Sequence, residues 1–251
     1  MTLDLKNTLS MTLVRMTTSP SVALVTGGSA GLGLALVRGL VGRGWSVVTD
    51  ARGADALGQA YAGTDVIAIA GDVTDPLHRE ELAAAVARLG RLDLLVNNAS
   101  HLGPSPQPAL ADYPLDELRR VYEVDVVAPL ALTQHLLPRL TESRGIVLNI
   151  SSDAAVEAYE GWGGYGSAKA ALDHASSVLA AEHPELAVYA VDPGDLRTAM
   201  HQAAFPDEDI SDRPEPHTVV PAFMNLLDSR PPSGRYRAAA FATTDAETVD
   251  A

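Results

Sequence analysis

Three polar residues in the second half of the chain are spaced so that they could act on one proton. Tyr165 and Lys169 are four residues apart in a stretch whose apolar residues recur with helical spacing, so they lie on one face of a helix. Ser152 follows the apolar run 146–150, which predicts a buried strand. A neighbouring ammonium favours phenolate and draws a tyrosine pKa down from about 10. These residues predict a proton-transfer site with Tyr165 as acid or base and Ser152 bonded to the substrate oxygen.

A phosphate-binding turn is predicted near the start of the chain. The run 22–26 is apolar, residues 27–33 read GGSAGLG, and apolar residues with helical spacing follow. Glycine lets the backbone approach a phosphate closely, and a helix N-terminus offers free N–H groups to an anion. The turn therefore predicts a bound pyrophosphate.

Strands and helices alternate along the rest of the sequence. Strands are expected at 22–26, 45–49, 66–70, 92–96, 146–150, 187–191 and 234–238, and helices at about 34–41, 76–90, 115–140, 168–179 and 219–227, with breaks at Pro129 and Pro138. This alternation predicts an α/β fold, a single-domain Rossmann-type doubly wound parallel sheet with helices on both faces. The polar, Pro-rich segment 200–216 is expected to be a loop, either over the mouth of the site or a solvated excursion. In such sheets ligands bind at the carboxyl ends of the strands.

Composition narrows the classes of function. The 251 residues, 47% hydrophobic, predict one domain at 21–240, with a flexible extension at 1–20 and a flexible tail at 241–251. A net charge of −14 argues against nucleic acid and anionic membranes as partners. No cysteine is present, no apolar run reaches the ~20 residues of a membrane span, and the first twenty residues show no signal-peptide core. We expect a cytoplasmic protein with no metal site.

Taken in order, these motifs resemble the short-chain dehydrogenase/reductase family over about residues 21–240. The matches are TGGSAGLG at 26–33, Asp72 with Val73, NNA at 97–99, Ser152, Tyr165 with Lys169, and Pro193-Gly194 followed by Thr198. Ser152 precedes Tyr165 by thirteen residues, which is the spacing typical of that family. Each motif alone is a weak signal, but six in the right order at predicted strand ends are a strong one.

The resemblance implies an NAD(P)-dependent oxidoreductase that transfers a hydride between nicotinamide and a small-molecule carbonyl or alcohol. Lys169 would lower the pKa of Tyr165 and hold the nicotinamide ribose. Homo-oligomers through the two long helices are also implied. The cofactor-binding residues that the resemblance implies are Gly27, Ser29, Gly31, Leu32, Gly33, Asp50, Arg52, Asp72, Val73, Asn98, Ala99, Tyr165, Lys169, Pro193, Gly194 and Thr198.

Three positions depart from the family pattern. Asp125 stands where the family's fourth catalytic residue, asparagine, is usual, so it is a catalytic candidate that could pair with Lys169 or be a tolerated isostere. Ser100 replaces the glycine of NNAG, and Asp192 stands where asparagine is common. A buried carboxylate is costly unless it is paired or protonated, so Asp125 is also the feature that favours a catalytically weak dinucleotide-binding sensor.

The choice of cofactor depends on two adjacent positions. An acid at the end of the second strand binds a ribose diol, whereas an arginine there accepts a 2′-phosphate. Arg52 favours NADP(H), and Asp50, one position before the usual acidic slot, is the alternative that favours NAD(H). We expect NADP(H). An apolar or aromatic substrate pocket is expected from Tyr159, Trp162, His101, Leu102, Met200 and Phe205, with local packing of these residues as the alternative.

Overall fold

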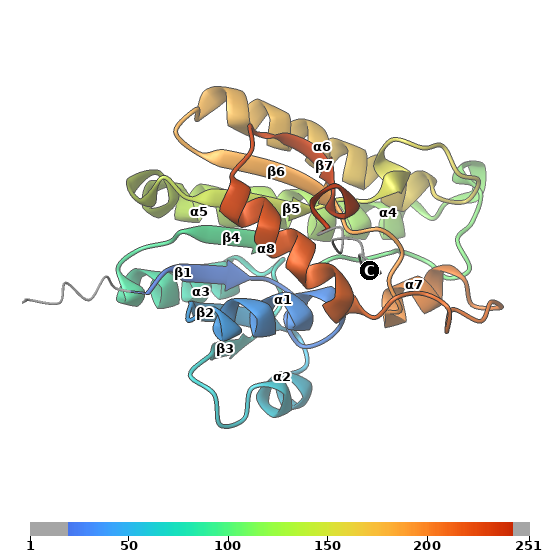
Figure 1. The fold of residues 1–251 in the computed structure, drawn as a ribbon. Helices are drawn as coiled ribbons and strands as arrows, with labels where there is room; N and C mark the ends of the chain where they lie inside the picture. Colours follow the sequence, from blue (N-terminus) through green and yellow to red (C-terminus); the bar gives the residue numbers. More distant parts are fainter. Residues whose placement is uncertain (1–19, 243–251) are drawn as a thin grey trace, which may run out of the picture.

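Seven parallel strands form one sheet in a computed structural model that describes residues 20–242. The strands are β1 (Val22–Val25), β2 (Ser46–Ala51), β3 (Ile67–Ala70), β4 (Leu94–Asn97), β5 (Ile146–Ile150), β6 (Ala187–Asp192) and β7 (Gly234–Arg237). Their order is β3-β2-β1-β4-β5-β6-β7 (Figure 1). The strand order reverses between β1 and β4, which is where open α/β sheets bind ligands. The predicted extension and tail lie outside the described residues, except Pro20, Phe241 and Ala242.

Helices cover both faces of the sheet. They are α1 (Gly31–Gly42), α2 (Ala54–Ala60), α3 (Pro76–Leu89), α4 (Leu115–Tyr122), α5 (Ala128–Ser143), α6 (Gly163–Glu182), α7 (Ala199–Ala204) and α8 (Val220–Ser229). Apolar residues of α1, α2 and α8 pack on one face, and those of α3, α5 and α6 pack on the other. Figure 1 shows α1 and α8 together on one side of the sheet. The predicted doubly wound α/β fold is confirmed.

The central strands are apolar because both faces of the sheet are covered. All four residues of β1 and all five of β5 are buried, which explains why both strands are apolar except at Asn149. One polar ladder crosses this core: Asn97 donates to Asn149 at 2.7 Å, and Asn149 donates to Ser176 at 2.7 Å. The ladder joins β4 to β5 and β5 to α6, so it positions α6, the helix with Tyr165 and Lys169, against the ends of these strands.

Two predictions about helices were wrong. The helix expected at 115–140 is broken at neither Pro129 nor Pro138: α4, a π-helical turn at Glu123–Val127 and α5 follow one another, Pro129 comes just after the π-helical turn, at the start of α5, and Pro138 lies inside α5. The expected loop 200–216 begins as α7, because the Thr198 side chain accepts from the His201 N–H at 3.1 Å and caps that helix. Short helices such as α2 and α7 carry too few apolar repeats to show a period.

Candidate active site

The glycine turn after β1 has the shape that a diphosphate requires. Gly27 and Gly31 have positive φ angles of 71° and 54°, and a Cβ on Gly33 would stand 2.3 Å from the Gly27 carbonyl oxygen. Within the described residues, no side chain caps the N-terminus of α1. Its first N–H groups are therefore available to an anion, so the turn fits the predicted pyrophosphate.

A cavity of about 580 Å³ opens at the carboxyl ends of the strands. Every predicted cofactor-binding residue lines it, and so does Ser152. Asp125 is the one predicted site residue outside this lining. Residues up to 171 positions apart in the sequence, from Gly27 to Thr198, thus meet around one cavity, as the motif order predicted.

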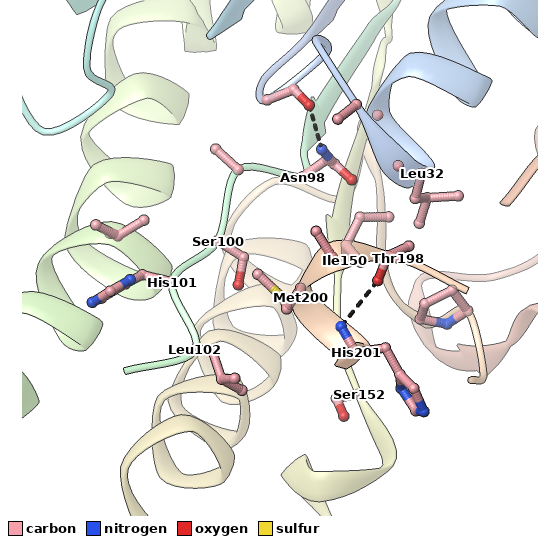
Figure 2. A pocket seen from close by; sticks show the side chains of 18 of the residues that line it. Leu32, Asn98, Ser100, His101, Leu102, Ile150, Ser152, Thr198, Met200 and His201 are labelled. Atoms are coloured by element: carbon pink, nitrogen blue, oxygen red, sulfur yellow. Dashed lines mark hydrogen bonds between the residues drawn. The ribbon is translucent and has the colours of Figure 1, made fainter. Parts of the chain in front are cut away.

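Asn98 points toward the glycine turn (Figure 2). Its side-chain amide donates to the Thr26 carbonyl at 2.8 Å, and its backbone N–H donates to the Thr26 hydroxyl at 3.0 Å. The resemblance implied that Asn98 binds the cofactor. In the structure its amide holds the end of β1 against the end of β4, so it helps to shape the glycine turn.

Tyr165 and Lys169 lie together at the deep end of the cavity. The Lys169 Nζ atom is 5.4 Å from the centre of the Tyr165 ring and donates to the Ile150 carbonyl at 3.0 Å. Burial raises the pKa of Tyr165, the Lys169 charge lowers it, and the net direction is upward. The sequence predicted a net fall. The lysine acts in the expected sense, but removal of the phenol from water outweighs it.

Ser152 lies just after the carboxyl end of β5 and is held there by hydrogen bonds to neighbouring residues. Its hydroxyl donates to Asp153 Oδ1 at 3.0 Å and accepts from the Ala154 N–H at 3.2 Å. Arg235, from β7, donates to the Ser152 carbonyl at 2.8 Å and to Asp173 at 3.0 Å. The edge strand therefore fixes the backbone of Ser152 through one guanidinium.

Asp125 lies beneath the cavity in the π-helical turn between α4 and α5, and it is fully buried. A π turn inside a helix often marks a functional position. Its Oδ1 atom accepts from the His101 N–H at 3.0 Å and is 3.9 Å from Lys169 Nζ. Burial raises the pKa of Asp125, and Lys169 only partly offsets that effect.

Asp50 lines the cavity, but both oxygens of its carboxylate contact other parts of the protein. Its Oδ1 atom accepts from the Gly27 N–H at 2.9 Å, and its Oδ2 atom is 3.0 Å from His78 Nε2. Asp50 is 1% exposed, whereas Arg52 is exposed at the rim. The carboxylate therefore supports the glycine turn, whereas Arg52 lines the cavity with an exposed side chain.

Part of the cavity wall near Tyr165 is apolar. Leu102, Trp162 and Met200 line it and pack in one cluster with Tyr165. Tyr159 and Phe205 do not line the cavity: they contact the Trp162 ring from outside, with ring centres 6.3 Å and 5.8 Å away. Of the six residues expected around a substrate, Leu102, Trp162, Met200 and His101 thus line the cavity, whereas Tyr159 and Phe205 pack against Trp162. That a substrate binds there stays a prediction.

Sequence reasoning missed His78, Asp173 and Arg235 as supports of the site. Asp173 is one helical turn after Lys169 on α6, and its carboxylate binds the Ser151 hydroxyl at 2.8 Å as well as Arg235. The i, i+4 spacing of Lys169 and Asp173 could have indicated this residue. Nothing in the sequence links His78 or Arg235 to the site, because both act across the sheet.

Comparison with known proteins decides the family. The sequence model described as short chain dehydrogenase matches residues 21–209. The chain belongs to the short chain dehydrogenase family. It is 37% identical over 186 residues to serine 3-dehydrogenase of Agrobacterium fabrum, covering 70% of this chain and 72% of that protein.

Solved structures of this family match the fold. A short chain dehydrogenase of Shigella flexneri 2a strain 301, complexed with NADP, gives a TM-score of 0.81 at 29% identity and covers 87% of this chain and 97% of that one. One from Escherichia coli CFT073, complexed with NADPH, gives 0.81 at 30% identity and covers 87% and 96%. The protein is therefore an oxidoreductase of the short-chain dehydrogenase/reductase family.

None of the helices in residues 20–242 combines the length and the hydropathy that crossing a bilayer demands. No group of three or more His, Cys, Asp or Glu side chains in the same range could hold a metal ion.

Proposed function

We propose that the protein is an NADP(H)-dependent reductase of apolar, flat carbonyl compounds, and that it also catalyses the reverse oxidation of the alcohols. The observation that carries this proposal is the convergence of Ser152, Tyr165 and Lys169 on the apolar end of a cavity whose other end is the glycine turn. The nicotinamide, when bound, supplies or accepts the hydride. The chain's own residues bind, orient and move the proton.

The proton step belongs to Tyr165. In reduction its phenol would donate to the carbonyl oxygen as the hydride arrives, with Ser152 as a second donor to that oxygen. Lys169 would favour the phenolate that forms, because its charge lowers the pKa of Tyr165. The net upward pKa keeps Tyr165 protonated at neutral pH, so it is ready to act as an acid.

NADP(H) is supported by the charges at the adenosine end. Asp50, the residue that favours NAD(H), is committed to Gly27 and His78. Arg52 also lines a second cavity of about 430 Å³, together with Arg119 and Arg120 of α4. Burial raises the pKa of Asp72, but Thr74, Arg52 and Arg120 outweigh it and the net direction is downward. Related proteins have been solved with NADP and NADPH.

A flat apolar substrate is supported by the walls of the other end. Tyr159 and Phe205 pack against the Trp162 ring, which lines the cavity together with Met200 and Leu102. Rigid aromatic walls favour flat ligands because stacking costs little conformational entropy. We therefore favour aryl ketones and aryl aldehydes.

The test is turnover at 340 nm with each cofactor over a panel of aryl ketones, alkyl ketones and the matching alcohols. The proposal predicts NADPH oxidation with aryl ketones at a higher kcat/KM than with alkyl ketones of equal size. Binding of NADPH without turnover of any substrate would instead identify the dinucleotide-binding sensor. We also propose a cytoplasmic homo-oligomer; Val127 and Leu130 near the start of α5 are 46% and 45% exposed, and Val178 of α6 is 42% exposed.

A further inference from the structure

Two of the positions that depart from the family pattern lie next to each other in the structure. Ser100 follows β4 and Asp125 lies in the π-helical turn. In Figure 2 the Ser100 side chain points into the cavity. The His101 N–H, next to Ser100 in the chain, donates to Asp125 Oδ1 at 3.0 Å, and Ser100 and Tyr165 line the same cavity. The Ser100 hydroxyl lowers the pKa of both Asp125 and Tyr165. The two substituted residues therefore lie beside the phenol that the proposed function uses.

Both side chains hold an unused polar atom. Asp125 Oδ2 and Ser100 Oγ are buried, and neither has a hydrogen-bond partner of good geometry among residues 20–242. Asp125 Oδ1, in contrast, is satisfied by the His101 N–H at 3.0 Å. A buried carboxylate oxygen without a donor is costly, but a protonated one becomes a donor and needs only an acceptor. The Ser100 hydroxyl is the unused acceptor beside it.

The charged groups around Ser100 and Asp125 are compatible with a protonated Asp125. Lys169 Nζ is 3.9 Å from Asp125 Oδ1, and it also faces Tyr165 on α6 and donates to the Ile150 carbonyl. Asp153 faces Tyr165 from the segment after β5, and Asp173 faces Lys169. The charge of Lys169 is therefore shared among several partners, and the full burial of Asp125 favours the neutral acid.

We propose that Asp125 is protonated at neutral pH and that Ser100 relays its proton to Tyr165. This rests on the proposed role of Tyr165. In reduction Tyr165 gives its proton to the carbonyl oxygen and becomes phenolate. The Ser100 hydroxyl then gives its proton to the phenolate and takes one from Asp125 Oδ2, so that the O–H bonds broken and formed are equal. Asp125 is left as carboxylate beside Lys169 until a proton returns from solvent. The reverse sequence serves alcohol oxidation.

The variants Ser100→Ala and Asp125→Asn test the relay, with Ser177→Ala as the matched control. Ser177 is an exposed hydroxyl on α6 that donates to the Asp173 carbonyl and takes no part in the site. The relay predicts that kcat for ketone reduction falls about 10-fold to 100-fold in both variants, since general acid catalysis is worth about 10² to 10⁴ in total. KM and NADPH affinity should stay within a factor of about 3 of the control, and small buffer acids such as imidazolium should restore kcat in Ser100→Ala.

Infrared difference spectroscopy supplies a readout that needs no turnover. The wild-type protein at pH 7 should show the carbonyl stretch of a buried carboxylic acid, and Asp125→Asn should lack it. Absence of that band from the wild type, or wild-type kcat in Ser100→Ala, would overturn the relay. If Asp125→Asn does not fold, Ser100→Ala carries the kinetic test alone. Full activity of Tyr165→Phe would instead overturn the proposed function itself, so the two failures are distinguishable.

Discussion

Replacement of Arg52 by alanine should remove the preference for NADPH. Arg52 is exposed at the rim, and the competing Asp50 is turned inward to Gly27 and His78. A hydrogen bond between charged groups contributes about 1.5–3 kcal/mol, which corresponds to about 10-fold to 150-fold in affinity. Arg52→Ala should therefore weaken NADPH binding by that factor and leave NADH binding unchanged, because NADH has no 2′-phosphate to lose.

The assay is titration of the protein with each cofactor, followed by fluorescence of Trp162, which lines the cavity. Arg88→Ala is the matched control, since Arg88 is an exposed arginine in the last turn of α3. Arg120 lies one helical turn before Val124, and Val124 lines both cavities. If Arg120 also binds the 2′-phosphate, the loss of NADPH affinity in Arg52→Ala should be close to about 10-fold, the lower end of the expected range. Equal loss of NADPH and NADH affinity in Arg52→Ala, or no loss of either, would refute the assignment.

Further predictions concern stability and assembly. His78 has a raised pKa, chiefly because of its hydrogen bond to Asp50; its stabilisation is therefore present below the unfolded pKa of about 6.5 and is lost as pH rises through the folded value. Denaturant unfolding of the wild type and of His78→Gln from pH 6 to 9 should show that the difference between their free energies of unfolding shrinks as pH rises. A difference that grows with pH would contradict this. Gly33→Ala should cost about 1–3 kcal/mol in a thermal melt and weaken cofactor binding, because a Cβ there would stand 2.3 Å from the Gly27 oxygen. Arg235→Met should lower the free energy of unfolding by about 2 kcal/mol, since it removes the hydrogen bond that Arg235 donates to Asp173. An unchanged Tm would be evidence against a stabilising role of this bond. Light scattering should show an oligomer at micromolar protein; a monomer would rule out assembly through α5 and α6.

Much of the site was predictable because strand ends in a parallel sheet must converge. The Gly turn, Asp72, Asn98, Ser152 and Thr198 each follow an apolar run, so their order alone placed them around one cavity. Tyr165 and Lys169 were predictable from helical spacing on α6. The cavity lining confirms that these residues meet, while their catalytic and binding roles stay predictions.

The direction in which a side chain points was not predictable from its position. Asp50 and Arg52 both lie near the end of β2, and only the packing of His78 from α3 shows that Asp50 is turned inward. Asp125 likewise depends on the π-helical turn and on the segment after β4, which are not visible in the local sequence. Such features arise from contacts between elements far apart in the chain, so periodicity and motif spacing cannot reveal them.

The role of Tyr165 is tested most directly by kcat/KM for reduction of an aryl ketone by Tyr165→Phe. The phenol is the proposed proton donor, so its loss should lower kcat/KM by about 10² to 10⁴, or about 3–5 kcal/mol of barrier. NADPH affinity and Tm should stay close to those of the wild type. A Tyr165→Phe protein that binds NADPH normally and keeps kcat/KM within about 3-fold of the wild-type value would contradict this role.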